Sequence, residues 1–135
     1  MLINILNHHP SRKIPSQRVQ SLLQKLARVS GLNREELNVV FLSDRKIRIY
    51  NRKYLGHDWP TDVIAFSYPP FAELLISLDT AKRQARELGH PFFHEIKILL
   101  IHGLLHLIGY KDKKKKDQKE MWAETEKLLK KVKGA

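Results

Sequence analysis

The segment that organises this chain is residues 91–112, with the sequence PFFHEIKILLIHGLLHLIGYKD. It is apolar on nearly every side as far as Ile108, and Pro91 suits the first turn of a helix. We therefore expect a buried helix at the centre of the molecule. Within it, His102 and His106 are four residues apart, so their Cβ atoms lie on one face, about 5–6 Å from each other.

A carboxylate follows the two histidines at a spacing that suits a metal site. Two imidazoles one turn apart can bind one zinc ion at about 2.0–2.1 Å each, but a third ligand must come from outside the helix. Gly109 suits the left-handed residue that ends a helix, and a turn there can bring Asp112 back to the histidines. Three protein ligands leave one position for water, as in catalytic zinc sites. We therefore predict that His102, His106 and Asp112 bind one Zn²⁺ per chain, or another divalent transition metal such as Ni²⁺, and act in catalysis through it.

Gly103 stands where zinc metalloproteases carry a catalytic Glu, which argues against peptide hydrolysis. A glycine inside a helix costs about 0.5–1 kcal/mol relative to Ala, so some other gain should offset it. We expect this gain to be the close approach of substrate or backbone beside the metal. The alternative for the two histidines is a pair of core side chains satisfied by their neighbours. Gly109 and Asp112 favour the metal site over that alternative.

Shorter elements surround the central helix. Apolar patterns predict strands at 2–6, 37–42, 63–67 and 74–78, and helices that begin at Pro15, Asp44, Asp79 and, with a capping box to Glu120, Asp117. Residues 68–71 should form a connection longer than a two-residue hairpin. This order predicts an α+β fold with a single domain over residues 1–135. In it, a small mixed four-stranded sheet packs against about five helices, and the metal site lies at the end of the central helix.

The charge of the chain indicates a polyanionic partner. Its 25 Lys and Arg residues exceed its 14 Asp and Glu residues, which gives a formal charge of +11. Nucleic acid is the first expectation and an anionic membrane surface the second, whereas the plain alternative is a highly charged solvated surface. The absence of cysteine excludes disulfides and thiolate metal ligands. It is compatible with the cytoplasmic location that we expect, as is an N-terminus without the pattern of a signal peptide.

The remaining histidines carry weaker predictions. His8, His9 and His90 look isolated and exposed, and His94 is expected to serve in packing. Glu95 lies on the same face of the helix as His102. It could accept the second N–H of a ligand histidine as an outer partner.

The central motif resembles the signature of the YbeY family of single-strand-specific, metal-dependent endoribonucleases. Residues 102–112, HGLLHLIGYKD, are similar to that family's H-G-x-L-H-L-x-G-Y-D-H. Residues 58–67, DWPTDVIAFS, resemble its D-x-P-T-D-V-L-S-F segment, and the likeness extends from about residue 37 to about residue 130. Two positions depart from the family pattern. Asp112 stands where the third ligand is usually His, and Leu55 stands where an Arg is common.

The resemblance implies an activity and its partners. It implies hydrolysis of RNA in ribosomal RNA processing, chiefly maturation of the 3′ end of 16S rRNA, and in ribosome quality control. Ribosomal RNA and the small ribosomal subunit would be partners, with no DNA specificity and no membrane partner. The bound zinc would lower the pKa of its water toward about 7 and neutralise charge at the scissile phosphate; the general base would lie elsewhere, or the metal hydroxide would act alone.

The substrate-binding residues come from two sources. The resemblance implies that Thr61 and Asp62 line the substrate cleft, and Arg52 stands close to the position of the missing Arg. Lys113, Lys114, Lys115 and Lys116 follow the metal motif directly, where they could bind phosphates. Two alternatives stay open: a small hydrolase that resembles zinc metalloproteases, and a non-catalytic RNA-binding factor of ribosome assembly with a structural metal.

Overall fold

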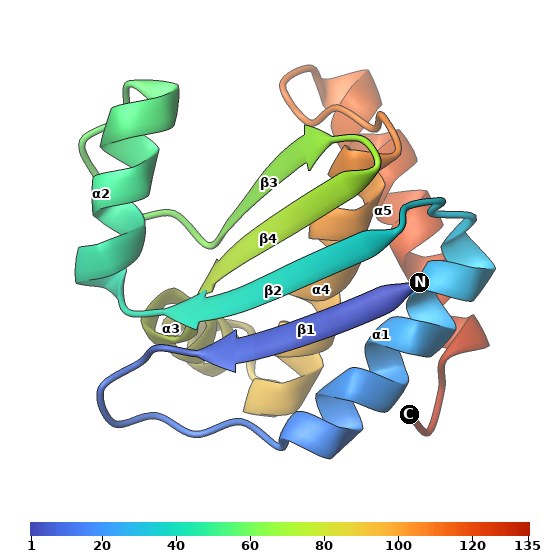
Figure 1. Cartoon of the computed structure of the whole chain (residues 1–135), viewed down its shortest axis with the longest axis horizontal. Helices are drawn as coiled ribbons and strands as arrows, with labels where there is room; N and C mark the ends of the chain where they lie inside the picture. The colour runs from blue at the N-terminus through green and yellow to red at the C-terminus, as the bar shows by residue number, and fades with distance from the viewer.

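The computed structural model describes all residues, 1–135, and has the α+β element order that the sequence predicts (Figure 1). The elements are β1 Leu2–Asn7, α1 Ser16–Ser30, β2 Glu36–Leu42, α2 Asp44–Leu55, β3 Val63–Tyr68, β4 Phe71–Ser77, α3 Leu78–Leu88, α4 Phe92–Leu107 and α5 Lys115–Lys131. The single domain, the five helices and the four strands confirm the predicted fold class.

The sheet is mixed, with the strand order β1-β2-β4-β3. Strands β1, β2 and β4 are parallel, and β3 pairs with β4 in the antiparallel sense. The parallel neighbours β1 and β2 need a crossover, which α1 provides, whereas β3 and β4 can form a hairpin. Helices α3 and α4 follow directly after β4, which is an inner strand of the sheet.

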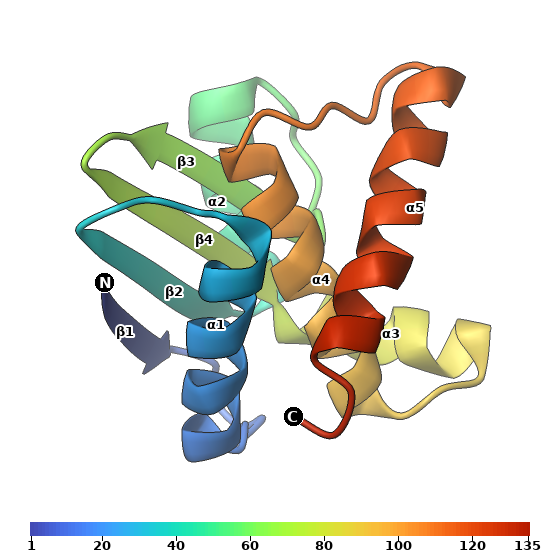
Figure 2. The same cartoon turned by 90° about the vertical axis from the view of Figure 1, so that its right-hand side faces the viewer.

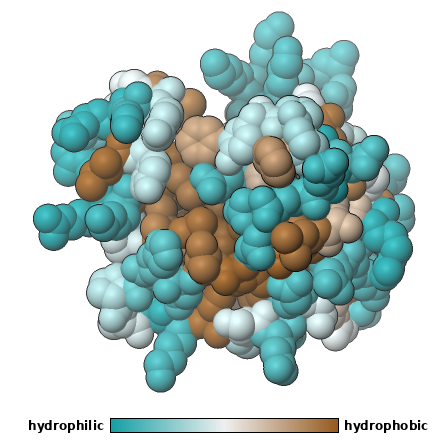
Figure 3. Space-filling view, in the orientation of Figure 1, coloured by the Kyte–Doolittle hydropathy of each residue, from teal (hydrophilic) through white to brown (hydrophobic).

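The helices α1, α4 and α5 lie on one face of the sheet, as Figure 2 shows. Successive side chains of a strand point to opposite faces. In β2, Val39 and Phe41 accordingly join the main core under these helices, whereas Val40 and Leu42 pack with Ile47 of α2 in a smaller cluster on the other face. That second face is mostly open, and apolar side chains show in its middle in Figure 3.

The central helix α4 is buried because it contacts β3, β4, α1, α3 and α5. Gly103 makes the close approach to the sheet possible, since a Cβ at this position would lie 2.7 Å from Cδ2 of Leu74 in β4. The gain that the structure shows for Gly103 is thus close packing against a core leucine, and the approach of a substrate beside the metal stays a prediction. No helix of the structure, α4 included, combines the length and the apolar character needed to cross a membrane.

Four local predictions are wrong at helix and strand ends. Helices α2 and α3 are capped by the hydroxyl groups of Ser43 and Ser77, one residue or more before the predicted acids. The β3–β4 pairing continues to Tyr68 and Phe71, so only two prolines, which lack an N–H for the ladder, form the turn. Helix α5 begins at Lys115, without the expected capping box.

Candidate functional site

The two motif histidines lie in the second half of α4, and the chain turns back immediately after them. Gly109 has φ +107°, and the N–H of Tyr110 donates to the carbonyl of Leu105 at 2.9 Å. This turn leads through an exposed loop into α5, so the end of α4 and the start of α5 lie at the same end of the molecule (Figure 2).

The turn sets the orientation of His106 and brings Asp112 beside it. Nδ1 of His106 lies 3.1 Å from the carbonyl oxygen of Tyr110. Because a carbonyl oxygen only accepts, Nδ1 donates its proton there, and in the neutral imidazole Nε2 carries the lone pair. Nε2 lies 3.3 Å from Oδ2 of Asp112. The predicted return of Asp112 to the second histidine is therefore present in the structure.

This contact between His106 and Asp112 is suited to a shared cation. A neutral imidazole nitrogen and a carboxylate oxygen are both acceptors, so they repel each other unless a cation or a proton lies between them. Two atoms bound to one tetrahedral zinc at about 2.0–2.1 Å are about 3.3 Å apart. The observed separation of 3.3 Å agrees with this value. The carbonyl of Tyr110 supplies the outer hydrogen bond that metal-binding histidines usually have.

His102 has an unsatisfied nitrogen. Its Nε2 is buried and has no hydrogen-bond partner. Burial lowers the pKa of His102 and favours the neutral imidazole, although the charges of Asp62 and Asp112 partly oppose this shift. A buried polar atom without a partner costs about 1–3 kcal/mol, so such atoms usually have a ligand or an ion to bind. A neutral imidazole with a free nitrogen fits a metal ligand.

The side chains of His102, His106 and Asp112 do not all meet at one point in the structure. No group of three His, Asp or Glu side chains is gathered closely enough to hold a metal ion. His106 and Asp112 contact each other, and His102 stands apart from this pair. The donor chemistry fits zinc, and metal binding by all three residues stays a prediction.

A hollow of about 260 Å³ lies beside His102 and contains Asp62, Glu95 and Trp122 in its lining. Asp62 accepts the N–H of Val63 at 2.7 Å through Oδ1 and faces Nε2 of Gln84 at 3.4 Å through Oδ2. Asp62 thus lines the same hollow as His102, and its place in a substrate cleft stays a prediction. Its neighbour Thr61 lies 3.5 Å from Oδ1 of Asp62 through its hydroxyl oxygen.

Trp122 was not expected at this site. Its ring lies 5.7 Å from the ring of His102 in an edge-to-face arrangement, although the two residues belong to different helices. The sequence does carry one signal, because Trp122 follows the buried Met121 about 100° further around an amphipathic helix and so lies beside the core face.

Glu95 has a different partner from the predicted one. The carboxylate is buried and lies 2.7 Å from Nε2 of His90, instead of meeting His102. Burial raises the pKa of Glu95, while the hydrogen bond to His90 lowers it in part. His90 also meets His94 edge to face at 4.9 Å, so His90 is not isolated.

The lysines that follow the motif are exposed next to it. Lys113 and Lys114 line a hollow of about 470 Å³ together with His106 and Asp112. Lys115 and Lys116 begin α5. Arg52 lies in the last turn of α2, 4.0 Å from Asp58, and lines neither hollow beside the histidines.

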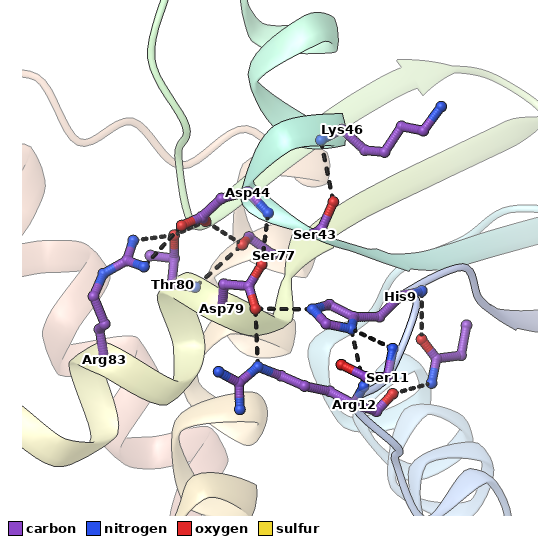
Figure 4. A network of polar contacts seen from close by, with 11 residues as sticks. His9, Ser11, Arg12, Ser43, Asp44, Lys46, Ser77, Asp79, Thr80 and Arg83 are labelled. Atoms are coloured by element: carbon purple, nitrogen blue, oxygen red, sulfur yellow. Dashed lines mark hydrogen bonds and ion pairs between the residues drawn. The ribbon is translucent and has the colours of Figure 1, made fainter.

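A second polar network ties the N-terminal loop to α2 and α3, at the ends of β2 and β4 (Figure 4). Asp79 lies 2.8 Å from Nε2 of His9 and 2.9 Å from Nε of Arg12, and it accepts the backbone N–H of Asp44. Burial alone would raise the pKa of Asp79, but these hydrogen bonds lower it to about 2. The predicted exposure of His9 is wrong, because this contact buries its side chain.

Comparison with known proteins identifies the family of the chain. The model of the endoribonuclease YbeY family matches residues 4–133. An endoribonuclease YbeY of Aquifex aeolicus is 37% identical over an alignment of 122 positions, which covers 85% of this chain and 81% of the relative. One of Bacillus velezensis is 35% identical over an alignment of 147 positions, which covers 96% of this chain and 94% of the relative. The solution structure of a Thermotoga maritima protein superposes with a TM-score of 0.69 at 28% identity, over 98% of this chain and 90% of the other. The chain belongs to the endoribonuclease YbeY family.

Proposed function

We propose that the protein is a metal-dependent endoribonuclease that cleaves single-stranded RNA. Relatives that are named endoribonuclease YbeY match this chain over most of their length. The observation that carries the proposal is the buried, unpartnered Nε2 of His102, one helical turn from the contact between His106 and Asp112. A net charge of +11 suits a polyanionic substrate.

Each part of the site has a distinct task in this proposal. His102, His106 and Asp112 hold the metal, with Zn²⁺ as the first expectation and Ni²⁺ as the second. The metal supplies positive charge for the scissile phosphate and a lowered pKa for water. The Tyr110 carbonyl keeps His106 in the tautomer whose Nε2 faces Asp112.

The residues around this set bind and position the substrate. Lys113 to Lys116 attract the phosphates of RNA; Lys113 and Lys114 line the hollow next to His106, and Lys115 and Lys116 begin α5. Asp62 lines the hollow next to His102, and the hydroxyl oxygen of Thr61 lies 3.5 Å from Oδ1 of Asp62. Arg52, at the end of α2, would contribute to RNA binding from farther away than these residues.

The proposed cellular role is ribosomal RNA processing in the cytoplasm, with maturation of the 3′ end of 16S rRNA and ribosome quality control. The small ribosomal subunit is the proposed partner. This role and this partner are what the family resemblance implies.

The protease alternative is disfavoured by the packing of Gly103. A Cβ at this position already meets Leu74 at 2.7 Å, so a catalytic Glu would have to enter the core between α4 and β4. The alternative of an assembly factor with a structural metal predicts metal binding without RNA cleavage.

The decisive experiment combines metal analysis with cleavage assays on protein purified without a histidine tag. We expect about one metal ion per chain, cleavage of single-stranded RNA, weaker cleavage of duplex RNA and no hydrolysis of casein. His102→Ala and His106→Ala should lose both metal and cleavage while keeping the fold. His8→Ala, at an exposed histidine outside the site, is the matched control. Cleavage that is undiminished in the two site variants would refute the proposal.

A further inference from the structure

Trp122 is an exposed aromatic side chain beside the proposed catalytic site. It belongs to α5 and is 47% exposed, although its ring meets His102 edge to face. Tryptophan is enriched at interfaces, where its large ring is apolar and its N–H can bond to a polar group. The neighbouring Met121 already serves the core, so the position of Trp122 is not needed to complete the packing of α5.

Two hollows meet at Trp122. One, of about 260 Å³, is shared with His102 and Asp62. The other is more open, has a volume of about 650 Å³ and follows the surface of α5, where Lys115 and Lys119 contribute to its lining. A chain lying along α5 would therefore pass over the indole and reach His102. Figure 2 shows that α5 runs alongside α4.

The charge on this face of α5 changes from positive to negative along the helix. Lys115 and Lys119 are one turn apart, about 6 Å along the axis, and Trp122 follows on the same face. Glu126, one further turn along, also lines the hollow and would repel phosphates. A phosphate backbone is thus attracted to the first half of α5, next to the loop that carries Asp112, and its bases can meet the indole.

We propose that Trp122 is a stacking platform for a nucleobase of single-stranded RNA next to the scissile phosphate, with Lys115 and Lys119 holding the adjoining phosphates. The inference rests on the proposed function and adds to it a residue that positions the substrate. Stacking on an aromatic side chain tolerates every base, because each base has a π face. Such a platform favours unpaired RNA, since the bases of a duplex are already stacked on each other.

Tryptophan fluorescence tests the contact directly, because the chain has only two tryptophans. In Trp59→Phe, the emission comes from Trp122 alone. We expect oligoadenylate to quench this emission with saturation, whereas inorganic polyphosphate, which has charge but no bases, should leave it nearly unchanged. Equal responses to both polymers, or no response to oligoadenylate at binding concentrations, would overturn the inference.

Substitution tests the energetic contribution. Trp122→Leu should weaken oligoadenylate binding by about 5- to 150-fold, whereas Trp122→Phe should keep most of the affinity. The slope of log affinity against log salt should not change, because no charge is removed. Phe71→Leu, at an exposed aromatic residue of the hairpin, is the matched control. Equal affinity of Trp122→Leu and the parent protein, with similar melting temperatures, would contradict the platform.

These outcomes are separable from the test of the proposed function. Base-dependent quenching in a protein that holds no metal and cleaves no RNA would keep the platform and remove the nuclease. Metal-dependent cleavage together with unchanged RNA binding in Trp122→Leu would support the nuclease and refute the platform.

Discussion

Gly103 of α4 lies directly against Leu74 of β4, so that a Cβ on residue 103 would be 2.7 Å from Cδ2 and 2.9 Å from Cδ1 of this leucine. The close packing sets how nearly the central helix approaches the sheet. It also fixes the rotation of α4, and with it the direction of the neighbouring His102. One position in the motif thus connects the packing of the core to the orientation of the site.

Gly103→Ala is expected to destabilise the protein by about 1–3 kcal/mol, because Leu74 is fully buried and must shift to admit the methyl group. Urea denaturation measures this change. Helix propensity alone would give the opposite sign, since Ala is favoured over Gly by about 1 kcal/mol. In the background of Leu74→Ala, which removes the clashing atoms, the same substitution should become neutral or stabilising. A stabilising effect in the parent protein would contradict the packing argument.

Asp112→Ala is expected to lower metal affinity by a large factor, whereas Asp112→His should retain it. Either Asp or His can bind zinc from this turn, and alanine offers no donor. Metal titration by calorimetry gives the affinities, with Asp117→Ala in the next helix as the control for the removal of a negative charge. Full metal content in Asp112→Ala would mean that Asp112 is a surface residue, and Asp62 would become the carboxylate to examine.

Replacement of Lys113 to Lys116 by Gln should weaken binding to all single-stranded RNA sequences alike, because interactions with phosphates carry no sequence information. The slope of log affinity against log salt should become shallower by about 0.7 for each phosphate that the variant no longer neutralises. Filter binding across a series of salt concentrations measures both. Lys130→Gln and Lys131→Gln, at the far end of α5, are the matched control. An unchanged slope after replacement of the four lysines would exclude them from the RNA site.

Asp79 should make stability depend on pH in acid. Its pKa is lowered to about 2 in the folded protein, and its side chain is one-quarter exposed. A carboxyl whose pKa is lower in the folded state stabilises the protein above its unfolded pKa. This contribution, about 2 kcal/mol, should therefore be lost as the pH falls from about 4 to about 2.

Urea denaturation at several pH values checks this expectation. Asp79→Asn should lower the free energy of unfolding at pH 7 and flatten the pH dependence below pH 4. Asp58→Asn, in an exposed ion pair with Arg48, should change little and serves as the control. An equal acid dependence in the parent and in Asp79→Asn would refute the role assigned to the network.

The order of the elements could be read from the sequence because it depends on local patterns. The apolar residues of 91–108 predict α4 whatever surrounds it, and the spacing of His102, His106 and Asp112 follows from helix geometry and one turn. The signature of the YbeY family is likewise contiguous. The predicted helix caps failed at Asp44 and Asp79 for the opposite reason, because both carboxylates are engaged by residues distant in the sequence.

The partners of the side chains depended on the folded chain. Leu74 lies opposite Gly103, Glu95 binds His90 instead of His102, His9 reaches Asp79, and Trp122 comes from another helix to meet His102. None of these pairs has a spacing that a helix or strand would impose. A buried polar atom or a core side chain takes whichever neighbour the packing of the layers brings within a few ångströms, and that neighbour is set by the sum of many weak interactions across the domain.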